Sequence, residues 1–253
     1  MPRSSYGGRH ELGQNFLTHR PTLRTLAGLL ADSSGPLLEI GAGDGALTRE
    51  LARLGRPLTA LDIDEHRVRR LARALPEVDV RHGDALRHHF DVPTVVGNVP
   101  FHLTTPILRR LLRTGTWRHA VLVTQWEVAR KRAGVGGGTM LTAQAGPWFT
   151  TRLVQRVPAH RFRPQPSVDG GVLEIRRRTE PLLPAARRAA YEQFVRTMFT
   201  GRGRGLDQIL ARATRSVPQR SRDALRRTGV GRGDLPRDLT AEQWVRLFLL
   251  TGR

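Results

Sequence analysis

The stretch that decides the fold is Glu39-Ile40-Gly41-Ala42-Gly43-Asp44-Gly45. An apolar run at 37–41 leads into it, and a helix-like stretch at 47–54 follows it. The glycines therefore lie where a strand turns into a helix, and without Cβ atoms they let the backbone bend sharply and approach a ligand. The pattern G-x-G-x-x-A at 41–46 also satisfies the dinucleotide fingerprint, so this stretch alone leaves a nicotinamide or flavin enzyme, a methyltransferase and a plain tight turn open.

Strand-like and helix-like segments alternate outward from this turn through the first 175 residues. The predicted strands are 37–41, 57–63, 78–80, 94–96 and 120–123, and the predicted helices are 47–54, 65–75 and 106–112. Alternation over this length is typical of a parallel sheet covered by helices on both faces, with ligands bound at the carboxyl ends of the strands. The sequence therefore predicts an α/β, Rossmann-like domain.

A change in composition marks a second, smaller part of the chain. Three consecutive arginines at 176–178 close an apolar, strand-like segment at 172–175. Beyond them apolar residues recur at helical spacing, first around Tyr191 and Phe194 and again around Trp244. We predict a catalytic domain over residues 1–178 and a small, all-helical domain over residues 179–253.

The charge balance favours a polyanionic partner. The chain has 42 Lys and Arg against 22 Asp and Glu, a formal net charge of +20, and such an excess favours nucleic acid. Residues 176–253 are the more basic part, with 18 Arg and 7 acidic residues. Guanidinium groups grip phosphate oxygens and stack on bases, so we predict that 179–253 is an RNA-binding domain. The alternative is a basic surface that only keeps the protein in solution.

Several classes of protein are excluded by what the sequence lacks. It contains no cysteine, which rules out disulfides, thiolate catalysis and Cys-ligated metal sites, and we expect no metal. No apolar run approaches the roughly 18 residues that cross a bilayer, and no secretory signal follows residues 1–10. We therefore expect a cytoplasmic protein with no membrane partner.

Two aspartates follow predicted strands at the edge where a ligand would bind. Asp62 ends the second strand, 21 positions after Gly41, and its carboxylate can accept both ribose hydroxyls of an adenosine group. Asp84 ends the third strand, where it can accept from an adenine amino group or cap a turn. Asp64 we interpret as the cap of the helix that starts at Glu65. This set indicates a bound nucleoside without fixing the reaction.

The motif Asn98-Val99-Pro100-Phe101 follows the fourth strand and separates the two enzyme classes. The exocyclic amine of a purine is a poor nucleophile because its lone pair is delocalised into the ring. The Asn98 side-chain oxygen and the Val99 carbonyl can each accept one N–H of that amine, and Pro100 stiffens the turn. Phe101 offers a flat face for an extruded base. A hydride-transfer enzyme needs none of these groups, although an ordinary turn with a core Phe remains the simpler alternative.

Taken together, the motifs resemble those of the ribosomal RNA adenine N6-dimethyltransferases. Within that family the resemblance is to the Erm-type 23S rRNA methyltransferases of macrolide resistance, because of the stretches 125–134, 138–144 and 235–240. It covers nearly the whole chain. The motifs that carry it are Gly13-Gln14-Asn15-Phe16-Leu17, the glycine stretch at 39–45, Asp62-Ile63-Asp64, Gly83-Asp84 and Asn98-Val99-Pro100-Phe101.

The resemblance implies a role for each matching residue. S-adenosylmethionine would be the cofactor, with Asp62 on its ribose, Asp84 on its adenine and Asn98 contacting both cofactor and target amine. Phe101 would stack on the target adenine, and Phe162 resembles the aromatic on the opposite wall of the base pocket. The remaining implied cofactor contacts are Asn15, Leu17 and Gly41.

The implied reaction is mono- or dimethylation of N6 of one adenine in the peptidyl-transferase region of 23S rRNA, which confers macrolide resistance. The implied substrate is protein-free rRNA or a precursor particle, and the implied enzyme is a monomer. Three other functions stay open: a 16S rRNA adenine dimethyltransferase of the small subunit, a non-catalytic nucleic-acid-binding module on the same fold, and a nucleotide-dependent oxidoreductase.

Overall fold

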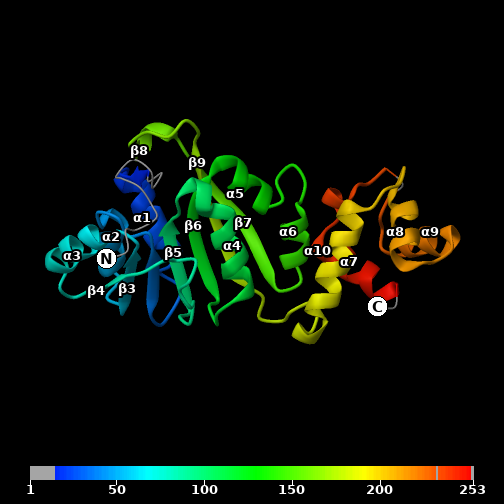
Figure 1. Ribbon diagram of the computed structural model, residues 1–253, viewed down its shortest axis with the longest axis horizontal. Coiled ribbons are helices and arrows are strands. Elements are labelled where there is room, and N and C mark those ends of the chain that lie inside the picture. The colour runs from blue at the N-terminus through cyan, green and yellow to red at the C-terminus, as the bar shows by residue number, and fades with distance from the viewer. Residues whose placement is uncertain (1–14, 232, 252–253) are drawn as a thin grey trace, which may run out of the picture. The chain divides into compact units, whose positions relative to one another are not determined.

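The computed structural model describes residues 15–231 and 233–251 (Figure 1). Contacts between Cα atoms group the chain into two units. The first comprises residues up to Arg130 together with Arg152–Arg176, and the second comprises Lys131–Thr151 together with Arg177–Arg253. Residues 131–151, which precede the boundary expected at 178, are thus grouped with the C-terminal helices. The assignment of a catalytic and an RNA-binding domain to these parts stays a prediction.

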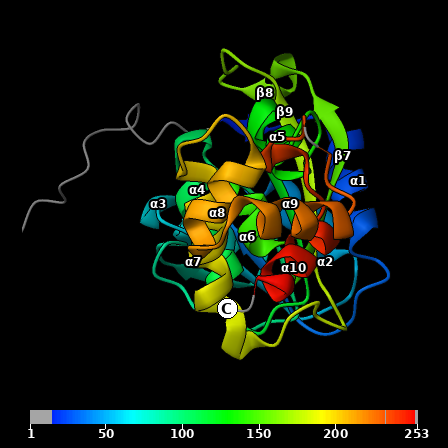
Figure 2. The same ribbon diagram turned by 90° about the vertical axis from the view of Figure 1, so that its right-hand side faces the viewer.

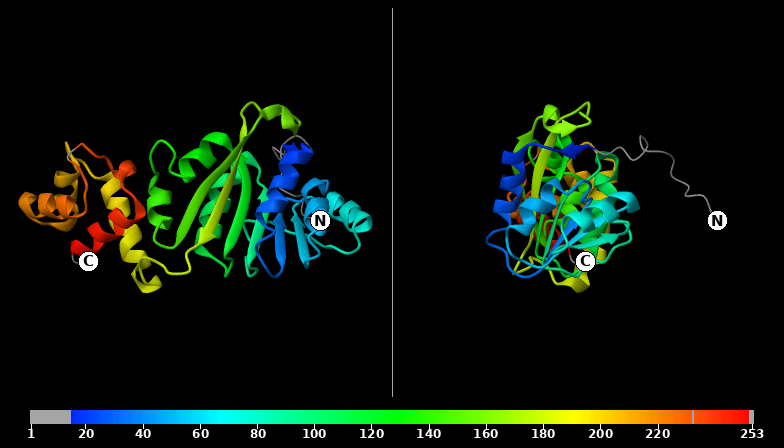
Figure 3. Two further views of the ribbon diagram at one scale, coloured as in Figure 1. Left: turned by 180° about the vertical axis from the view of Figure 1, so that it is seen from behind. Right: turned by 90° about the vertical axis from the view of Figure 1, so that its left-hand side faces the viewer.

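A seven-stranded sheet in the order β4-β3-β2-β5-β6-β9-β7 organises the first unit. The strands from β2 to β6 are parallel, and β9 runs antiparallel to β6. Figure 3 shows the sheet from behind. The strands are β2 (Leu37–Ile40), β3 (Leu58–Asp62), β4 (Asp79–His82), β5 (Thr94–Asn98), β6 (His119–Gln125), β7 (Phe149–Val157) and β9 (Gly170–Arg177). A separate two-stranded ladder pairs β1 (Phe16–Leu17) with β8 (Phe162–Arg163).

Helices precede β2 and follow β2, β3, β5 and β6, and the alternating pattern predicts those after β2, β3 and β5. They are α1 (Arg20–Leu29), α2 (Ala46–Ala52), α3 (Glu65–Ala74), α4 (Thr104–Arg113) and α5 (Trp126–Arg132). Short 3₁₀ turns are η1 (Phe101–Leu103), η2 (Ala159–Arg161), η3 (Ala185–Arg187) and η4 (Pro236–Asp238). The helix and strand predictions for residues 37–123 are confirmed to within a few residues at each end.

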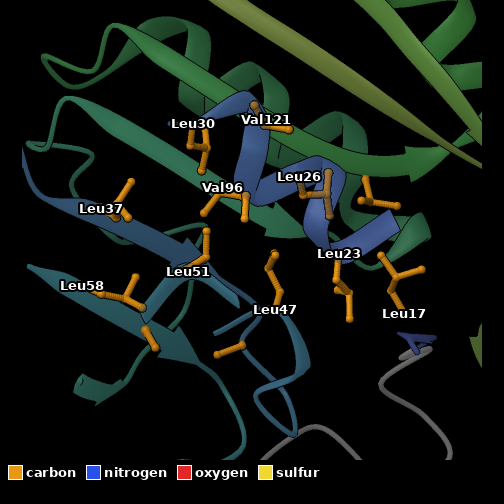
Figure 4. Packing of buried hydrophobic residues seen from close by; sticks show 14 of the residues in the cluster. Leu17, Leu23, Leu26, Leu30, Leu37, Leu47, Leu51, Leu58, Val96 and Val121 are labelled. Carbon is orange, nitrogen blue, oxygen red and sulfur yellow. The ribbon is translucent and has the colours of Figure 1, made fainter. Parts of the chain in front are cut away.

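The core of the first unit forms where α1 and α2 pack on the sheet (Figure 4). Leu26 and Leu30 of α1 have no exposed surface, and they lie with Val96 and Val121 from neighbouring strands. Burying a side chain of this size contributes about 1.5–3 kcal/mol. This packing holds the strands in register, which in turn fixes where their carboxyl ends lie.

The second unit has a core of aromatic rings. Its helices are α6 (Met140–Ala145), α7 (Arg188–Thr200), α8 (Leu206–Thr214), α9 (Pro218–Arg227) and α10 (Ala241–Leu250) (Figure 2). Tyr191 of α7 meets Trp148 and Phe248 edge-on, with ring centroids 5.8 and 5.4 Å apart. The buried Tyr191 hydroxyl donates to the Ala143 carbonyl at 2.9 Å, which attaches α6 to α7. Between Arg178 and Thr251 the described residues form helices and turns but no strand, as predicted for this part of the chain.

No helix within the described ranges is long and apolar enough to span a membrane. Gly13 and Gln14 of the N-terminal motif, and the stretch 1–10 considered for a signal, lie outside the described residues.

Candidate active site

The carboxyl ends of β2 and β5 meet at the centre of the sheet. These strands are neighbours, while β3 and β4 continue to one side of β2 and β6 continues to the other side of β5. The chain therefore leaves this point in opposite directions, which opens a crevice in which ligands of α/β folds bind. Gly41 follows β2 and Asn98 ends β5, so the topology brings the two principal motifs together.

The glycine turn needs its glycines for two different reasons. Gly41 has φ +73°, and a Cβ there would lie 3.2 Å from the Asn98 carbonyl oxygen. Gly43 has φ +54°, and a Cβ there would lie 2.7 Å from Cε1 of Phe16. Both positions combine a left-handed backbone with close approach of another group, which only glycine tolerates without strain.

Asp62 holds the glycine turn from the end of β3. Its Oδ2 accepts from the Gly43 amide at 2.7 Å, and its Oδ1 accepts from the Asp64 amide at 2.9 Å. Burial raises the pKa of Asp62 above its usual value, although the two amide donors act in the opposite direction. Because each carboxylate oxygen accepts more than one hydrogen bond, both retain capacity for the ribose hydroxyls that the sequence analysis assigned to this residue.

Asp64 caps α3, as predicted, because its carboxylate accepts from the amides of His66 and Arg67 at 3.0 and 3.2 Å. Asp84 both caps a turn and lies at a cavity, which are the two alternatives that its position in the sequence left open. Its Oδ1 accepts from the Leu86 amide at 2.8 Å, which stabilises the turn after β4, and the residue also lines a cavity.

Two neighbouring cavities lie at this edge of the sheet. One, of about 480 Å³, is lined by residues that include Ile63, Asp84 and Ile107. The other, of about 350 Å³, is lined by the described N-terminal residues Asn15 and Phe16 and by the Asn98 motif. The linings share four residues, which are Gly41, Asp62, Val99 and Pro100. An apolar cavity with an acceptor at its rim suits an adenine, so together the cavities fit an adenosine group followed by a short polar chain.

Asn98 has one half of its amide already engaged. Its Nδ2 donates to the Asn15 carbonyl at 2.7 Å. The Val99 amide donates to the Val123 carbonyl of β6 at 3.0 Å, which ties the following turn to the sheet. With Nδ2 fixed in this way, the Oδ1 acceptor of Asn98 is left for another N–H donor.

Phe101 and Phe162 meet edge-on, with ring centroids 5.9 Å apart and an interplanar angle of 74°. Phe101 is half-buried and lines the smaller cavity. Phe162 is 1% exposed, and Gly170 makes room for its ring, since a Cβ there would lie 2.8 Å from Cζ. In this structure Phe101 can offer a face to a base, whereas the buried Phe162 ring packs against Phe101 and supports it. Leu17, expected to contact the cofactor, is 3% exposed and pairs with Phe162 in the β1–β8 ladder instead of lining either cavity.

Phe16 is a site residue that the sequence analysis did not single out. Its ring lies over the glycine turn, and the Arg67 guanidinium carbon is 4.4 Å from the ring centroid. Arg67 also pairs with Asp44 of the glycine stretch. The sequence shows a bulky residue between Asn15 and Leu17, which is a signal that this position has a role. It does not show the contact with Arg67 of α3, because Arg67 is distant in sequence.

Glu39 of β2, two residues before Gly41, is a buried carboxyl to which the motifs assign no role. It is 1% exposed, and its Oε2 has no hydrogen-bond partner within the described part of the chain. Burial raises the pKa of Glu39 to about 8, and the nearby Asp62 carboxylate contributes in the same direction. The raised pKa favours the protonated, neutral form of Glu39 at neutral pH.

The match to known proteins agrees with this geometry. A family model described as ribosomal RNA adenine dimethylase matches residues 6–252. The chain belongs to this rRNA adenine dimethylase family. Its resemblance to that family, drawn from the motifs, is thereby confirmed, and so is the Rossmann-like methyltransferase fold.

Individual members of the rRNA adenine dimethylase family differ in their similarity to this chain. The mycinamicin-resistance protein MyrB of Micromonospora griseorubida is 52% identical over 96% of this chain and 79% of MyrB. The crystal structure of the 23S rRNA methyltransferase ErmE matches with a TM-score of 0.85 and 35% identity, covering 94% of this chain and all of ErmE's. Ribosomal RNA small subunit methyltransferase A of Myxococcus xanthus is 32% identical, and the match covers 97% of this chain and 91% of the Myxococcus protein.

Proposed function

We propose that this protein transfers a methyl group from S-adenosylmethionine to N6 of an adenine in the peptidyl-transferase region of 23S rRNA, and so confers resistance to macrolide antibiotics. The single observation that carries the chemistry is the Asn98 amide, which lines a cavity beside Phe101 with its donor engaged by Asn15. The choice of 23S over 16S rRNA is supported by the greater similarity to MyrB and ErmE than to the small-subunit enzyme.

The residues of the two cavities suit this cofactor. Asp62 would accept the ribose hydroxyls, Asp84 the adenine amino group, and Gly41 would allow close approach of the methionine part. S-adenosylmethionine, when bound, supplies a methyl group activated by the sulfonium to which it is attached.

The chain's own residues prepare the target amine. Asn98 Oδ1 and the Val99 carbonyl accept one N–H each, which turns the nitrogen lone pair out of conjugation with the ring. The bond from Asn98 Nδ2 to Asn15 and the bond from the Val99 amide to Val123 hold both acceptors before the base arrives. Phe101 stacks on the flipped adenine. Because no proton must be moved before attack, positioning supplies most of the rate.

The second unit carries the charge that suits an RNA backbone. Segment 201–230, which contains α8 and α9, has two acidic residues, and the only ion pair described within it joins Arg226 to Asp223. Arg204, Arg222 and Arg226 line an open groove. We infer that this segment contacts rRNA phosphates. Its exposed arginines are Arg202, Arg204, Arg212, Arg215, Arg220, Arg222, Arg226 and Arg227.

Three narrower points stay predictions: the substrate is protein-free or precursor rRNA, the enzyme acts as a monomer, and it acts in the cytoplasm.

The deciding experiment incubates the purified protein with labelled S-adenosylmethionine and protein-free 23S or 16S rRNA, and maps the modified base by primer-extension arrest. Label on one adenine of 23S rRNA is expected. Label on 16S rRNA would replace the proposal with the small-subunit activity, and no label with intact RNA binding would favour a non-catalytic module.

Asn98→Ala tests the mechanism in the same assay. Loss of a preorganised acceptor is expected to lower kcat about 10²- to 10³-fold, while affinity for rRNA stays nearly unchanged. Calorimetry with S-adenosylmethionine controls for disturbance of the Asn15 contact. Near-normal methylation by this variant would refute the acceptor role.

A further inference from the structure

The Arg156 guanidinium lies over the Trp126 ring at the edge of the sheet that carries the proposed active site. Trp126 begins α5 directly after β6 ends, so it lies at the same edge of the sheet as Asn98. The guanidinium carbon of Arg156, near the end of β7, is 5.3 Å from the Trp126 ring centroid. The Arg156 side chain is 60% exposed and the Trp126 side chain is half-buried. Neither residue has a part in the chemistry described above.

Asp169 fixes both members of the pair. Its Oδ2 accepts from Nε of Arg156 at 2.7 Å, and its backbone carbonyl accepts from the Trp126 amide at 2.8 Å. Its Oδ1 accepts from the Ala159 amide at 2.8 Å, so the carboxylate is itself held in place. That amide and Arg156 lower the pKa of Asp169, which keeps the carboxylate ionised. The guanidinium is therefore held through Nε and lies over the Trp126 ring.

The start of β9 connects this pair to the base pocket. Gly170 accommodates the Phe162 ring that supports Phe101, and the next residue, Gly171, accommodates Trp126, since a Cβ there would lie 3.2 Å from Cε3. Successive residues of a strand face opposite sides of the sheet. Phe162 and Trp126 thus contact successive residues at the start of β9 from opposite faces of the sheet, and both lie at the edge where β6 ends.

Arg152 of β7 forms an ion pair similar to that of Arg156 but has no aromatic ring beside it in the part of the chain that the structure describes. It also lies on β7, its side chain is 61% exposed, and it pairs with a carboxylate of β9, Glu174, at 2.6 Å. Among the described residues it has no ring contact. The ion pair alone therefore does not account for the Trp126 ring beneath Arg156.

We propose that the Arg156 guanidinium, stacked on Trp126, is a platform on which a base next to the flipped adenine stacks. The inference rests on the proposed function and adds a residue that positions the RNA. RNA-binding proteins stack unpaired bases on guanidinium planes as well as on aromatic rings. Because Asp169 compensates much of the Arg156 charge, the outer face of this plane suits a base better than a phosphate.

The test compares Arg156→Ala and Arg156→Lys with Arg152→Ala as the matched control, on an rRNA fragment that contains the methylated adenine. Both Arg156 variants are expected to raise KM for RNA about tenfold, with kcat within about twofold of wild type. Arg152→Ala is expected to leave both constants unchanged. A lysine keeps the charge but lacks the plane, so a wild-type KM for Arg156→Lys would overturn the proposal.

RNA fragments that lack one base on either side of the target adenine provide the second readout. At one of these positions the missing base is expected to raise KM for the wild type about tenfold. For Arg156→Ala, the same missing base is expected to leave KM at the value that this variant has with the complete fragment. Equal effects on both proteins at both positions would overturn the proposal. Unchanged cofactor affinity by calorimetry shows that the variants are folded. If the wild type methylates no rRNA, the proposed function itself has failed, which is distinct from failure of the platform.

Discussion

Glu39→Gln is expected to make the protein more stable than wild type at alkaline pH and to lose that advantage in acid. The Glu39 carboxyl of β2 is 1% exposed, Asp62 lies nearby, and the Glu39 Oε2 has no hydrogen-bond partner among residues 15–231 and 233–251. Glutamine has the same shape as the protonated acid and carries no charge at any pH. The variant therefore removes the cost of ionising this group and introduces an amide whose cost does not depend on pH.

The magnitude follows from the pKa of Glu39, raised by burial from 4.5 to about 8. Below pH 4.5 the group is protonated in both the folded and the unfolded chain. Between pH 4.5 and 8 the unfolded chain gives up the proton while the folded chain keeps it, so the free energy of unfolding falls with rising pH. The fall is about 1.4 kcal/mol per pH unit, reaches at most about 5 kcal/mol, and levels off above pH 8.

Urea denaturation of wild type and Glu39→Gln at pH 5, 7 and 9 measures this effect. The difference in unfolding free energy between the two proteins should grow from pH 5 to about pH 8 and then level off, whereas any cost of the unpaired amide adds a constant. Glu77→Gln, at an exposed position before β4, is the control and should show no such trend. A pH-independent difference for Glu39→Gln would refute the reasoning, since it would mean that Glu39 ionises normally in the folded protein.

Two further substitutions test the surroundings of the site. Gly43→Ala places a Cβ 2.7 Å from Phe16 at a residue with φ +54°, and the left-handed backbone alone costs about 1–2 kcal/mol. Cofactor affinity, measured by calorimetry, should therefore fall about tenfold or more. Wild-type affinity of the variant would contradict the strain at this turn. Asp64→Ala removes the acceptor for two amides at the start of α3, so chemical denaturation should show a loss of about 1 kcal/mol, and no loss would mean that water replaces the cap.

Sequence patterns predicted the parts of this protein that depend on local order. The strands around Gly41 and Asn98 are short apolar runs with turn signals at their ends, and both the parallel sheet and the meeting of these motifs follow from alternation and topology. The Asp64 cap was predictable for the same reason, because its hydrogen bonds reach only two and three residues along the chain.

Contacts between distant segments were beyond the reach of these patterns. Phe16 contacts Arg67, and Arg156 contacts Trp126 and Asp169. None of these partners is a neighbour in sequence. The grouping of residues 131–151 with the C-terminal helices depends similarly on Tyr191 reaching Ala143. The burial of Phe162 could not be settled from the sequence, because a pattern shows that an aromatic is present but not which of its faces is covered.

The pairing of β1 with β8 constrains how the protein is completed during its synthesis. Phe16 and Leu17 are among the earlier residues to leave the ribosome, yet their partners are Arg163 and Phe162. Until those partners have emerged, the segment that carries Asn15 and Phe16 has no strand to pair with, and the wall that it adds to the smaller cavity is missing. The residues of the glycine turn and of the strands from β2 to β6 therefore all precede, in chain order, the partner that this wall of the smaller cavity requires.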